Sequence, residues 1–193
     1  MNLKSVLISI SFLVTQFAIA QHLNLGFKAG LNIFTIQNDP GSTNDSKLGL
    51  HAGLIGHTHF TKHFAMQPEL QFSMKGAQNS ISNQDTKLNL SYITLPILFQ
   101  YMFNNGFRIQ AGPEFGLLVQ AKQKTGSSSV DVKDQLNSFD VGIAGGISYV
   151  HPPTGFGIDL RYVKGLSNIN SEGSATSKNQ GIQVGLFYLL KHN

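Results

Sequence analysis

The sequence contains no cysteine in its 193 residues. This absence excludes disulfide bonds, thiolate metal sites, cysteine nucleophiles and a lipid-modified N-terminal cysteine. Charged residues are scarce as well, at 12%. The net charge of +4 gives a pI near 9.3, yet lysine and arginine never gather into a run. Because a basic footprint for nucleic acid is missing, we expect no nucleic-acid partner.

The N-terminus has the three parts of a secretory signal. The first four residues carry one positive charge, residues 5–17 are mostly apolar, and Ala18-Ile19-Ala20 places small residues where a signal peptidase cleaves. A membrane anchor needs about 20 apolar residues, whereas this run is shorter and interrupted by polar residues. We therefore expect residues 1–20 to be a cleaved signal peptide and residues 21–193 to form one mature domain.

No later stretch is long and apolar enough for a membrane-spanning helix; instead, apolar side chains recur at every second position. In the first segment, Leu23, Leu25, Phe27, Ala29, Leu31 and Ile33 alternate with polar residues and glycine. Such alternation predicts β-strands with one apolar and one polar face. The same pattern covers residues 48–60, 64–75, 107–120, 139–149, 156–162 and 181–188.

Residues 88–103 are apolar on both faces and contain Pro96. A proline within a paired strand removes one donor from the hydrogen-bond ladder. We therefore expect an irregularity near Pro96. The residues expected on the outward face are Ile93, Leu95, Ile97, Phe99 and Tyr101.

The predicted connections alternate between long and short. The long ones are residues 35–47, 76–87, 123–137 and 167–179, and the short ones are residues 61–62, 104–106 and 152–154. In outer-membrane barrels, short turns face the periplasm and long loops face outside. The sequence thus predicts an all-β fold, an eight-stranded antiparallel up-and-down transmembrane β-barrel with a porin-like fold, located in the bacterial outer membrane with both termini periplasmic.

Charges and aromatic residues favour a lipid-facing wall. The strand charges fall on the polar phase, with Lys164 at a strand end as the exception, and a lysine or arginine facing mid-bilayer costs roughly 2 to 4 kcal/mol. A soluble barrel of the lipocalin type would turn the apolar phase inward and remains the structural alternative. Aromatic residues collect near the short turns, as in an interfacial girdle: Phe60, Phe64, Tyr101, Phe103, Phe107, Tyr149, Phe156 and Tyr188.

An ordered set of short segments resembles the PorT-like outer-membrane β-barrel family. The resemblance implies an outer membrane location and an eight-stranded barrel, and links a few relatives to protein secretion or gliding; it supplies no catalytic residues. The segments are Leu25-Gly26-Phe27-Lys28-Ala29-Gly30-Leu31-Asn32, Gln67-Pro68-Glu69-Leu70, Lys75-Gly76-Ala77, Ile93-Thr94-Leu95-Pro96, Ala111-Gly112-Pro113 and Asp159-Leu160-Arg161-Tyr162.

Charged residues on the polar phase predict a network inside the barrel. An eight-stranded barrel has a lumen just wide enough for side chains to fill, and buried charges persist when they are paired. A narrow conduction path or a small-ligand site would instead need unpaired charges. The predicted lumen network contains Lys28, Glu69, Arg108, Glu114, Asp140, Asp159 and Arg161, with Lys75 and Lys122 as further cations on this phase.

Four histidines, His51, His57, His59 and His63, lie near one another with Glu69 and suggest a metal site or a hydrolytic base. Three of them fall near a short turn, where solvated polar residues are ordinary, and no nucleophile accompanies them. Asp39 and Asp45 match no calcium-loop spacing. We expect no catalytic, metal or cofactor site.

Three functions remain open. The favoured one is a non-enzymatic outer-membrane protein, surrounded by outer-membrane lipid, that is structural or binds another envelope protein through loops or periplasmic turns, in association with secretion. The second is a lipid-modifying enzyme, which needs histidine, serine and an acid at the lipid-facing rim. The third is a secreted soluble barrel that binds an apolar ligand.

Overall fold

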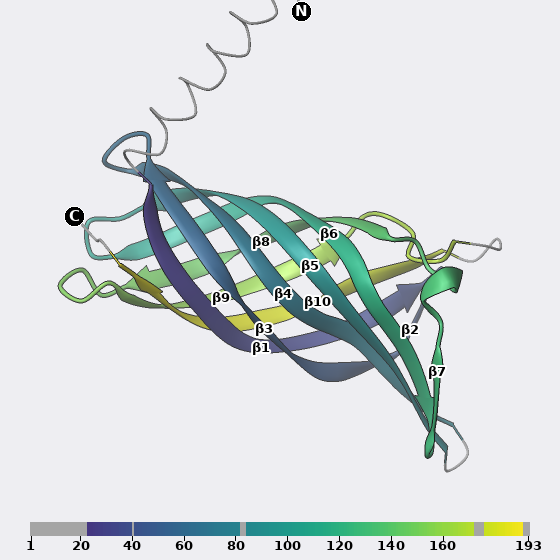
Figure 1. The fold of residues 1–193 in the computed structure, drawn as a ribbon. Coiled ribbons are helices and arrows are strands. Elements are labelled where there is room, and N and C mark those ends of the chain that lie inside the picture. The colour runs from purple at the N-terminus through teal and green to yellow at the C-terminus, as the bar shows by residue number, and fades with distance from the viewer. Residues whose placement is uncertain (1–22, 40, 82–83, 172–175, 191–193) are drawn as a thin grey trace, which may run out of the picture.

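The computed structural model describes residues 23–39, 41–81, 84–171 and 176–190 and shows a barrel of tilted antiparallel strands (Figure 1). The predicted signal peptide lies outside the described residues. Two short strands, β2 (Ser42–Thr43) and β7 (Ser128–Asp131), and a 3₁₀ turn, η1 (Lys133–Gln135), lie in the connections. The barrel strands are β1 (Asn24–Asn38), β3 (Asp45–His59), β4 (Phe64–Ile81), β5 (Gln84–Met102), β6 (Phe107–Thr125), β8 (Phe139–Val150), β9 (Phe156–Gly165) and β10 (Ser177–Leu189).

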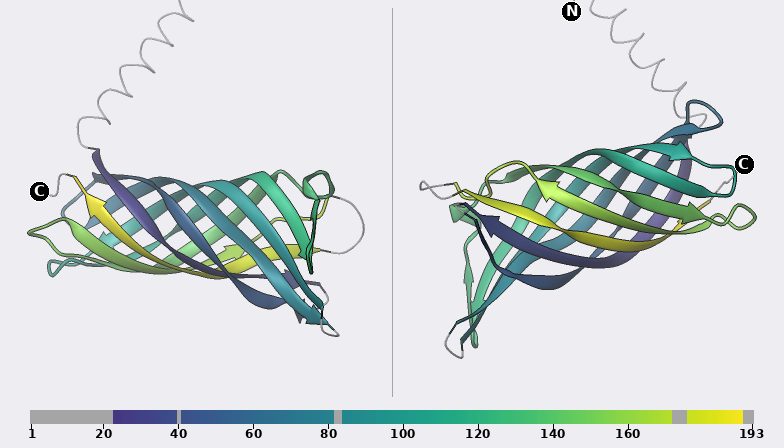
Figure 2. Two further views of the ribbon diagram at one scale, coloured as in Figure 1. Left: turned by 60° about the horizontal axis from the view of Figure 1, so that its bottom comes forward. Right: turned by 180° about the vertical axis from the view of Figure 1, so that it is seen from behind.

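Each long strand pairs with its neighbours in chain order, and β10 pairs with β1 to close the sheet. The closing ladder runs from Gly26 opposite Leu189 to Asn38 opposite Ser177. All pairings are antiparallel, so the prediction of eight up-and-down strands is confirmed. Figure 2 shows the closed wall from two further sides. No helix in the described part of the chain is long and apolar enough to cross a membrane.

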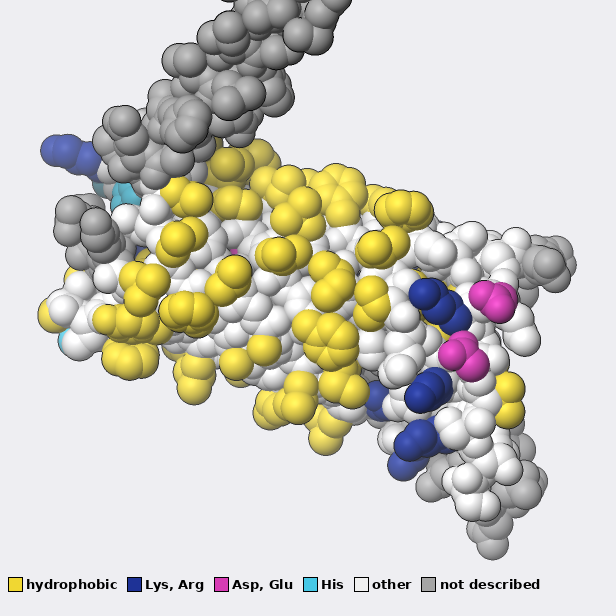
Figure 3. Space-filling view, viewed as in Figure 1, with side chains coloured by type: hydrophobic (Ala, Val, Ile, Leu, Met, Phe, Trp, Pro, Cys, Tyr) yellow, Lys and Arg dark blue, Asp and Glu magenta, His cyan; other side chains and the backbone are white. Residues whose placement is uncertain are grey.

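The apolar phase of every barrel strand faces outward, and Figure 3 shows the apolar side chains as a band around the visible side of the barrel. Phe27 is 55% exposed, whereas its neighbour Lys28 is 3% exposed. Burying this wall in hydrocarbon is favourable at roughly 25 cal/mol per Å², and leaving it in water is not. The soluble barrel with an apolar interior is therefore excluded.

The facing predicted for residues 88–103 is confirmed, but the irregularity is not at Pro96. Ile93 and Phe99 are exposed, and Pro96 lies opposite Glu114 in regular register. The shift lies nearer the other end of the strand, where Ser91 and Tyr92 oppose Gln120 and Leu118 and leave Val119 without a partner. An extra residue of this kind forms a β-bulge.

The bulge reverses the phase of β6 beyond Val119. Leu118 and Ala121 are both buried in the lumen, although strict alternation would place them on opposite faces. Neighbouring residues on a strand face opposite sides, so Lys122 faces outward. The prediction that Lys122 belongs to the polar inward phase was wrong, because a single inserted residue inverts every side chain that follows it.

Much of the predicted loop sequence at residues 35–47, 76–87 and 123–137 is β-structure. Residues 76–81 pair with residues 84–89 in a continuous ladder, from Gly76 opposite Asn89 to Ile81 opposite Gln84. The predicted loop at residues 76–87 is therefore a hairpin that prolongs β4 and β5, and β7 prolongs the sheet beside β6. We call this end of the barrel the loop end.

The opposite end, which we call the turn end, carries tight connections. Residues 60–63, 103–106 and 151–155 join consecutive strands there. Gly106 adopts φ +87°, and its N–H donates to the carbonyl oxygen of Phe103 at 3.1 Å. The predicted aromatic girdle lies at this end, where Phe64 contacts Tyr101 (ring centroids 5.2 Å apart) and Phe156 contacts Tyr188 (4.7 Å).

Candidate functional site

A four-membered charge cluster occupies the middle of the lumen. The Arg161 guanidinium donates two hydrogen bonds to Glu69, at 2.9 Å to Oε2 and 2.8 Å to Oε1, and a third to Asp159. Lys28 Nζ donates to Asp159 and lies 3.7 Å from Glu69 Oε2. All four residues are at most 3% exposed. The fork geometry of arginine and carboxylate makes this a strongly bound group, and each of its four charges lies within 4.0 Å of an opposite charge.

A second cluster lies nearer the loop end. Lys75 Nζ contacts Glu114 Oε1 at 2.8 Å and Asp140 Oδ2 at 3.7 Å. Asp140 also accepts a hydrogen bond from Asn179 Nδ2 at 2.9 Å. Lys75 Nζ lies 5.2 Å from the ring centroid of Tyr92, which is within cation–π range. Each of the four lumen carboxylates therefore has a cation within 4.0 Å.

Arg108 is the exception in the predicted network. It is 2% exposed, and no carboxylate lies within 4.0 Å of it among the described residues. Its Nη1 donates to Gln100 Oε1 at 3.3 Å. Gln100 Nε2 in turn donates to Gln67 Oε1 at 3.0 Å and to Gln110 Oε1 at 2.8 Å. The structure thus joins six of the seven predicted residues, with Lys75, in ion pairs and places Arg108 in a glutamine cluster.

Apolar side chains fill the lumen at other levels. The cluster at the loop end contains Tyr92, Leu118 and Ala121, and another contains Phe34, Leu98, Ala144 and Val163. A third cluster, at the turn end, contains Ile55, Val150, Phe187 and Leu189. Along β6, Arg108, Glu114 and Leu118 follow one another from the turn end to the loop end, so charged and apolar layers succeed each other along the lumen.

The histidines are separated by the fold. His51 lies in the lumen, where its Nδ1 is 2.8 Å from Asn32 Oδ1. His57 Nε2 lies 3.0 Å from His59 Nε2 near the turn end. His63 stacks beside Tyr101, with ring centroids 6.0 Å apart. Within the described ranges, no three histidine or carboxylate side chains are placed to hold one metal ion.

Sequence reasoning missed the uncharged members of the lumen network. Asn32, Gln67, Gln100 and Gln183 are each at most 2% exposed. Their inward position follows the same period-two phase as the charged residues, so the signal was present. Tyr92 is inward as well, as the outward facing predicted for Ile93 implies, but its segment is apolar on both faces and gave no sign of a polar contact.

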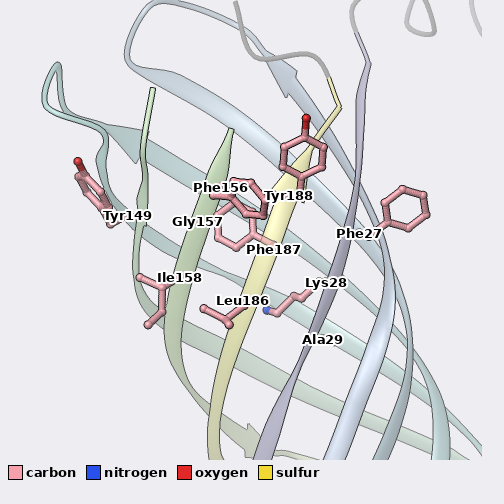
Figure 4. Close-up of a pocket in the computed structure, with 10 residues that line it drawn as sticks. All are labelled: Phe27, Lys28, Ala29, Tyr149, Phe156, Gly157, Ile158, Leu186, Phe187 and Tyr188. Atoms are coloured by element: carbon pink, nitrogen blue, oxygen red, sulfur yellow. The ribbon is translucent and has the colours of Figure 1, made fainter. Parts of the chain in front are cut away.

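The outer wall has a hollow of about 500 Å³ beside the closing ladder. Figure 4 shows Phe27, Phe156, Ile158, Leu186 and Tyr188 around it. These side chains are outward and mostly exposed, whereas Lys28 and Phe187 turn into the lumen. The hollow therefore opens to the lipid side of the wall and is separate from the charged interior.

A closed barrel with an apolar outer wall and a lumen of paired charges defines the class of bacterial outer-membrane β-barrels. Residues 19–171 match the outer membrane protein beta-barrel domain family, and the chain belongs to that family. No curated protein matches the sequence significantly.

Solved structures are similar to this chain at low sequence identity. Neisserial surface protein A (NspA) is 14% identical, with a TM-score of 0.59 over 85% of this chain and 96% of that chain. Ail, the attachment invasion locus protein of Yersinia pestis, is 13% identical, with a TM-score of 0.49 over 86% of this chain and 99% of that chain. The similarity to NspA supports the fold alone.

Proposed function

We propose that this chain is a non-enzymatic outer-membrane protein with a closed lumen that acts through its ends, by binding another envelope component. Its short turns and both termini face the periplasm, and its loop end faces outside. The filled lumen carries this proposal. Because paired charges and apolar clusters occupy successive levels of the interior, the surfaces left for recognition are the rims and the outer wall.

The long hairpins support a role for the loop end. A barrel strand needs about 9 to 11 residues to cross a bilayer, whereas β5 and β6 have 19 residues each. Since the turns at the other end are short, the surplus projects from the loop end. A rigid scaffold that carries extended loops is a common arrangement for binding.

The engagement of the inward polar groups supports a non-enzymatic role. His51 contacts Asn32 and Glu69 is held by Arg161. Both lie buried in the lumen and not at the lipid-facing rim. The PorT-like resemblance adds protein secretion as the process to examine. Deleting the gene and comparing the secreted proteins tests that association; an unchanged set of secreted proteins contradicts it.

Planar-bilayer recording of the purified full chain tests the closed lumen. We expect no stable single-channel current, because moving an ion through the lumen requires displacing the buried charge pairs. An open eight-stranded protein of known conductance serves as the positive control for insertion. A reproducible current from the wild-type chain would contradict the closed-lumen proposal.

Photo-crosslinking in living cells tests the binding surface. A crosslinking residue in place of Val130 in β7, which is 59% exposed, should yield a discrete adduct with an envelope component. Asn105 in a turn at the other end is the matched position. Adducts from Asn105 alone would move the proposed contact to the periplasmic turns, and adducts from neither position would favour a purely structural role.

A further inference from the structure

Four lysines lie near one another at the loop end, on three strands of one side of the barrel. They are Lys47 on β3, Lys87 on β5, and Lys122 and Lys124 on β6, and we call them the lysine patch. Figure 3 shows basic side chains gathered where the apolar band ends, at the end of the barrel away from the N-terminus. Lys47 lies opposite the buried Phe34 and next to Leu48, which is 70% exposed on the outer wall, so Lys47 turns toward the lumen side. The other three lysines border the lipid-facing surface.

Strand register brings like charges together in this patch. Lys87 lies directly opposite Lys124, and Lys122 lies opposite Asn89, one step nearer the apolar band. Leu90 and Ala121, the next pair of this ladder, are buried in the lumen. Because side chains alternate along a strand, these three lysines face outward. Like charges directly opposite each other on neighbouring strands are destabilising, so Lys87 and Lys124 repel each other in this register.

The neighbouring charges leave the centre of the patch positive. Burial and the positive charge of Lys87 lower the pKa of Lys47, so these two ammonium groups repel each other. In the described part of the chain, no ion pair joins a carboxylate to any of the four lysines. Asp131 lies opposite Lys122 at one edge, and its Oδ1 accepts the Lys133 N–H at 2.9 Å. Asp45, opposite Gln78, stands at the other edge.

We propose that the lysine patch binds the phosphate groups of the phosphorylated glycolipid that forms the outer leaflet of bacterial outer membranes. An anion bound between Lys87 and Lys124 would attract both ammonium groups and so offset their mutual repulsion. The apolar wall next to the patch, with exposed residues such as Ile93, Leu117 and Phe139, suits the acyl chains of the same molecule. The assignment to the outer leaflet rests on the orientation given under Proposed function.

The test is a lipid titration of the full mature chain in phosphatidylcholine nanodiscs, with bound molecules counted by native mass spectrometry. The probes are diphosphoryl lipid A, fully dephosphorylated lipid A and inorganic phosphate. The variant is Lys87→Gln with Lys124→Gln. Its control is Lys62→Gln with Lys164→Gln, which removes the same charge from a turn and from an isolated exposed lysine at the loop end of β9.

We expect the affinity for diphosphoryl lipid A to fall about fivefold for each patch lysine removed and to stay unchanged in the control. Dephosphorylated lipid A should bind equally to the wild-type chain and to the variant, because it has no phosphate for the lysines to contact. Equal losses in variant and control, or binding that ignores the phosphates, would overturn the proposal. Complete displacement of lipid A by millimolar inorganic phosphate would also overturn it, since the site would then take free phosphate.

The folding of each protein is checked by its gel mobility with and without heating. If the double variant does not fold, the single variants Lys87→Gln and Lys124→Gln are used in its place. The nanodisc titration does not depend on which end of the barrel faces outside. A periplasmic location of the loop end, tested separately below, would therefore remove the outer-leaflet assignment while leaving a measured phosphate affinity intact.

Discussion

Individual side chains in the lumen are arranged as pairs because charges in a low-dielectric interior are stable only with partners. Among the described residues, eight charged side chains are buried in the lumen, four cations and four anions. Seven of them lie within 4.0 Å of an opposite charge, and Arg108 lies among glutamines instead. The loss in the free energy of unfolding on removing one side chain should therefore depend on whether an unpaired buried charge remains.

Arg161→Gln and Arg108→Gln form a matched comparison, since both remove one buried guanidinium. We expect Arg161→Gln to lower the free energy of unfolding by about 3 to 5 kcal/mol, because Glu69 and Asp159 would then share Lys28 alone. Arg108→Gln should cost about 1 kcal/mol or less, because it removes a single hydrogen bond to Gln100. Urea unfolding in phosphatidylcholine vesicles measures both, and equal losses would contradict this account.

Among the strands, the pairing of β1 with β10 decides whether the sheet is a barrel or an open sheet. The ladder joins the first and last strands, which no turn connects. Leu31 lies opposite Val184 in this ladder, and both side chains face outward. A closed sheet also removes the unpaired edges that a bilayer does not tolerate.

Leu31→Cys combined with Val184→Cys tests this closure. Because the chain has no cysteine of its own, oxidation of the folded protein should give one intramolecular disulfide, seen as a reductant-sensitive change in gel mobility. Leu31→Cys with Val141→Cys on β8 is the control and should give none. Crosslinking in neither variant, or equally in both, would argue against the β1–β10 ladder.

The whole molecule is asymmetric along its axis. An aromatic girdle and short turns mark one end, and prolonged hairpins with the lysine patch mark the other. Aromatic residues lie at both interfaces of membrane proteins in general, so the girdle alone does not define direction. The unequal connections support the proposed direction, because outer-membrane barrels place long loops outside.

Cysteine labelling of intact cells tests the orientation. Ser128→Cys at the loop end and Asn105→Cys at the turn end are both exposed positions in a chain without other cysteines. A membrane-impermeant maleimide should label Ser128→Cys in intact cells and Asn105→Cys only after the outer membrane is permeabilised. The reverse result would invert the proposed orientation.

The period-two pattern of the sequence was enough to predict most of the strands, the face each one presents to lipid, and the inward position of Lys28, Glu69 and Arg161. This was possible because alternation is a local property, and a membrane wall enforces it on every strand. The pattern ceases toward the loop end, where the outer face of a strand no longer meets lipid, so residues 76–87 of this ladder were mistaken for a loop.

Contacts between distant residues required the folded barrel. Lys28 and Asp159 are 131 residues apart, and only the closing register of β1, β10 and β9 places them side by side. The bulge at Val119 likewise depends on how β6 pairs with β5, and it turns Lys122 from the lumen to the outer face. Alternation along one strand specifies which face a side chain occupies, whereas its partner depends on the register between strands, which the sequence pattern does not contain.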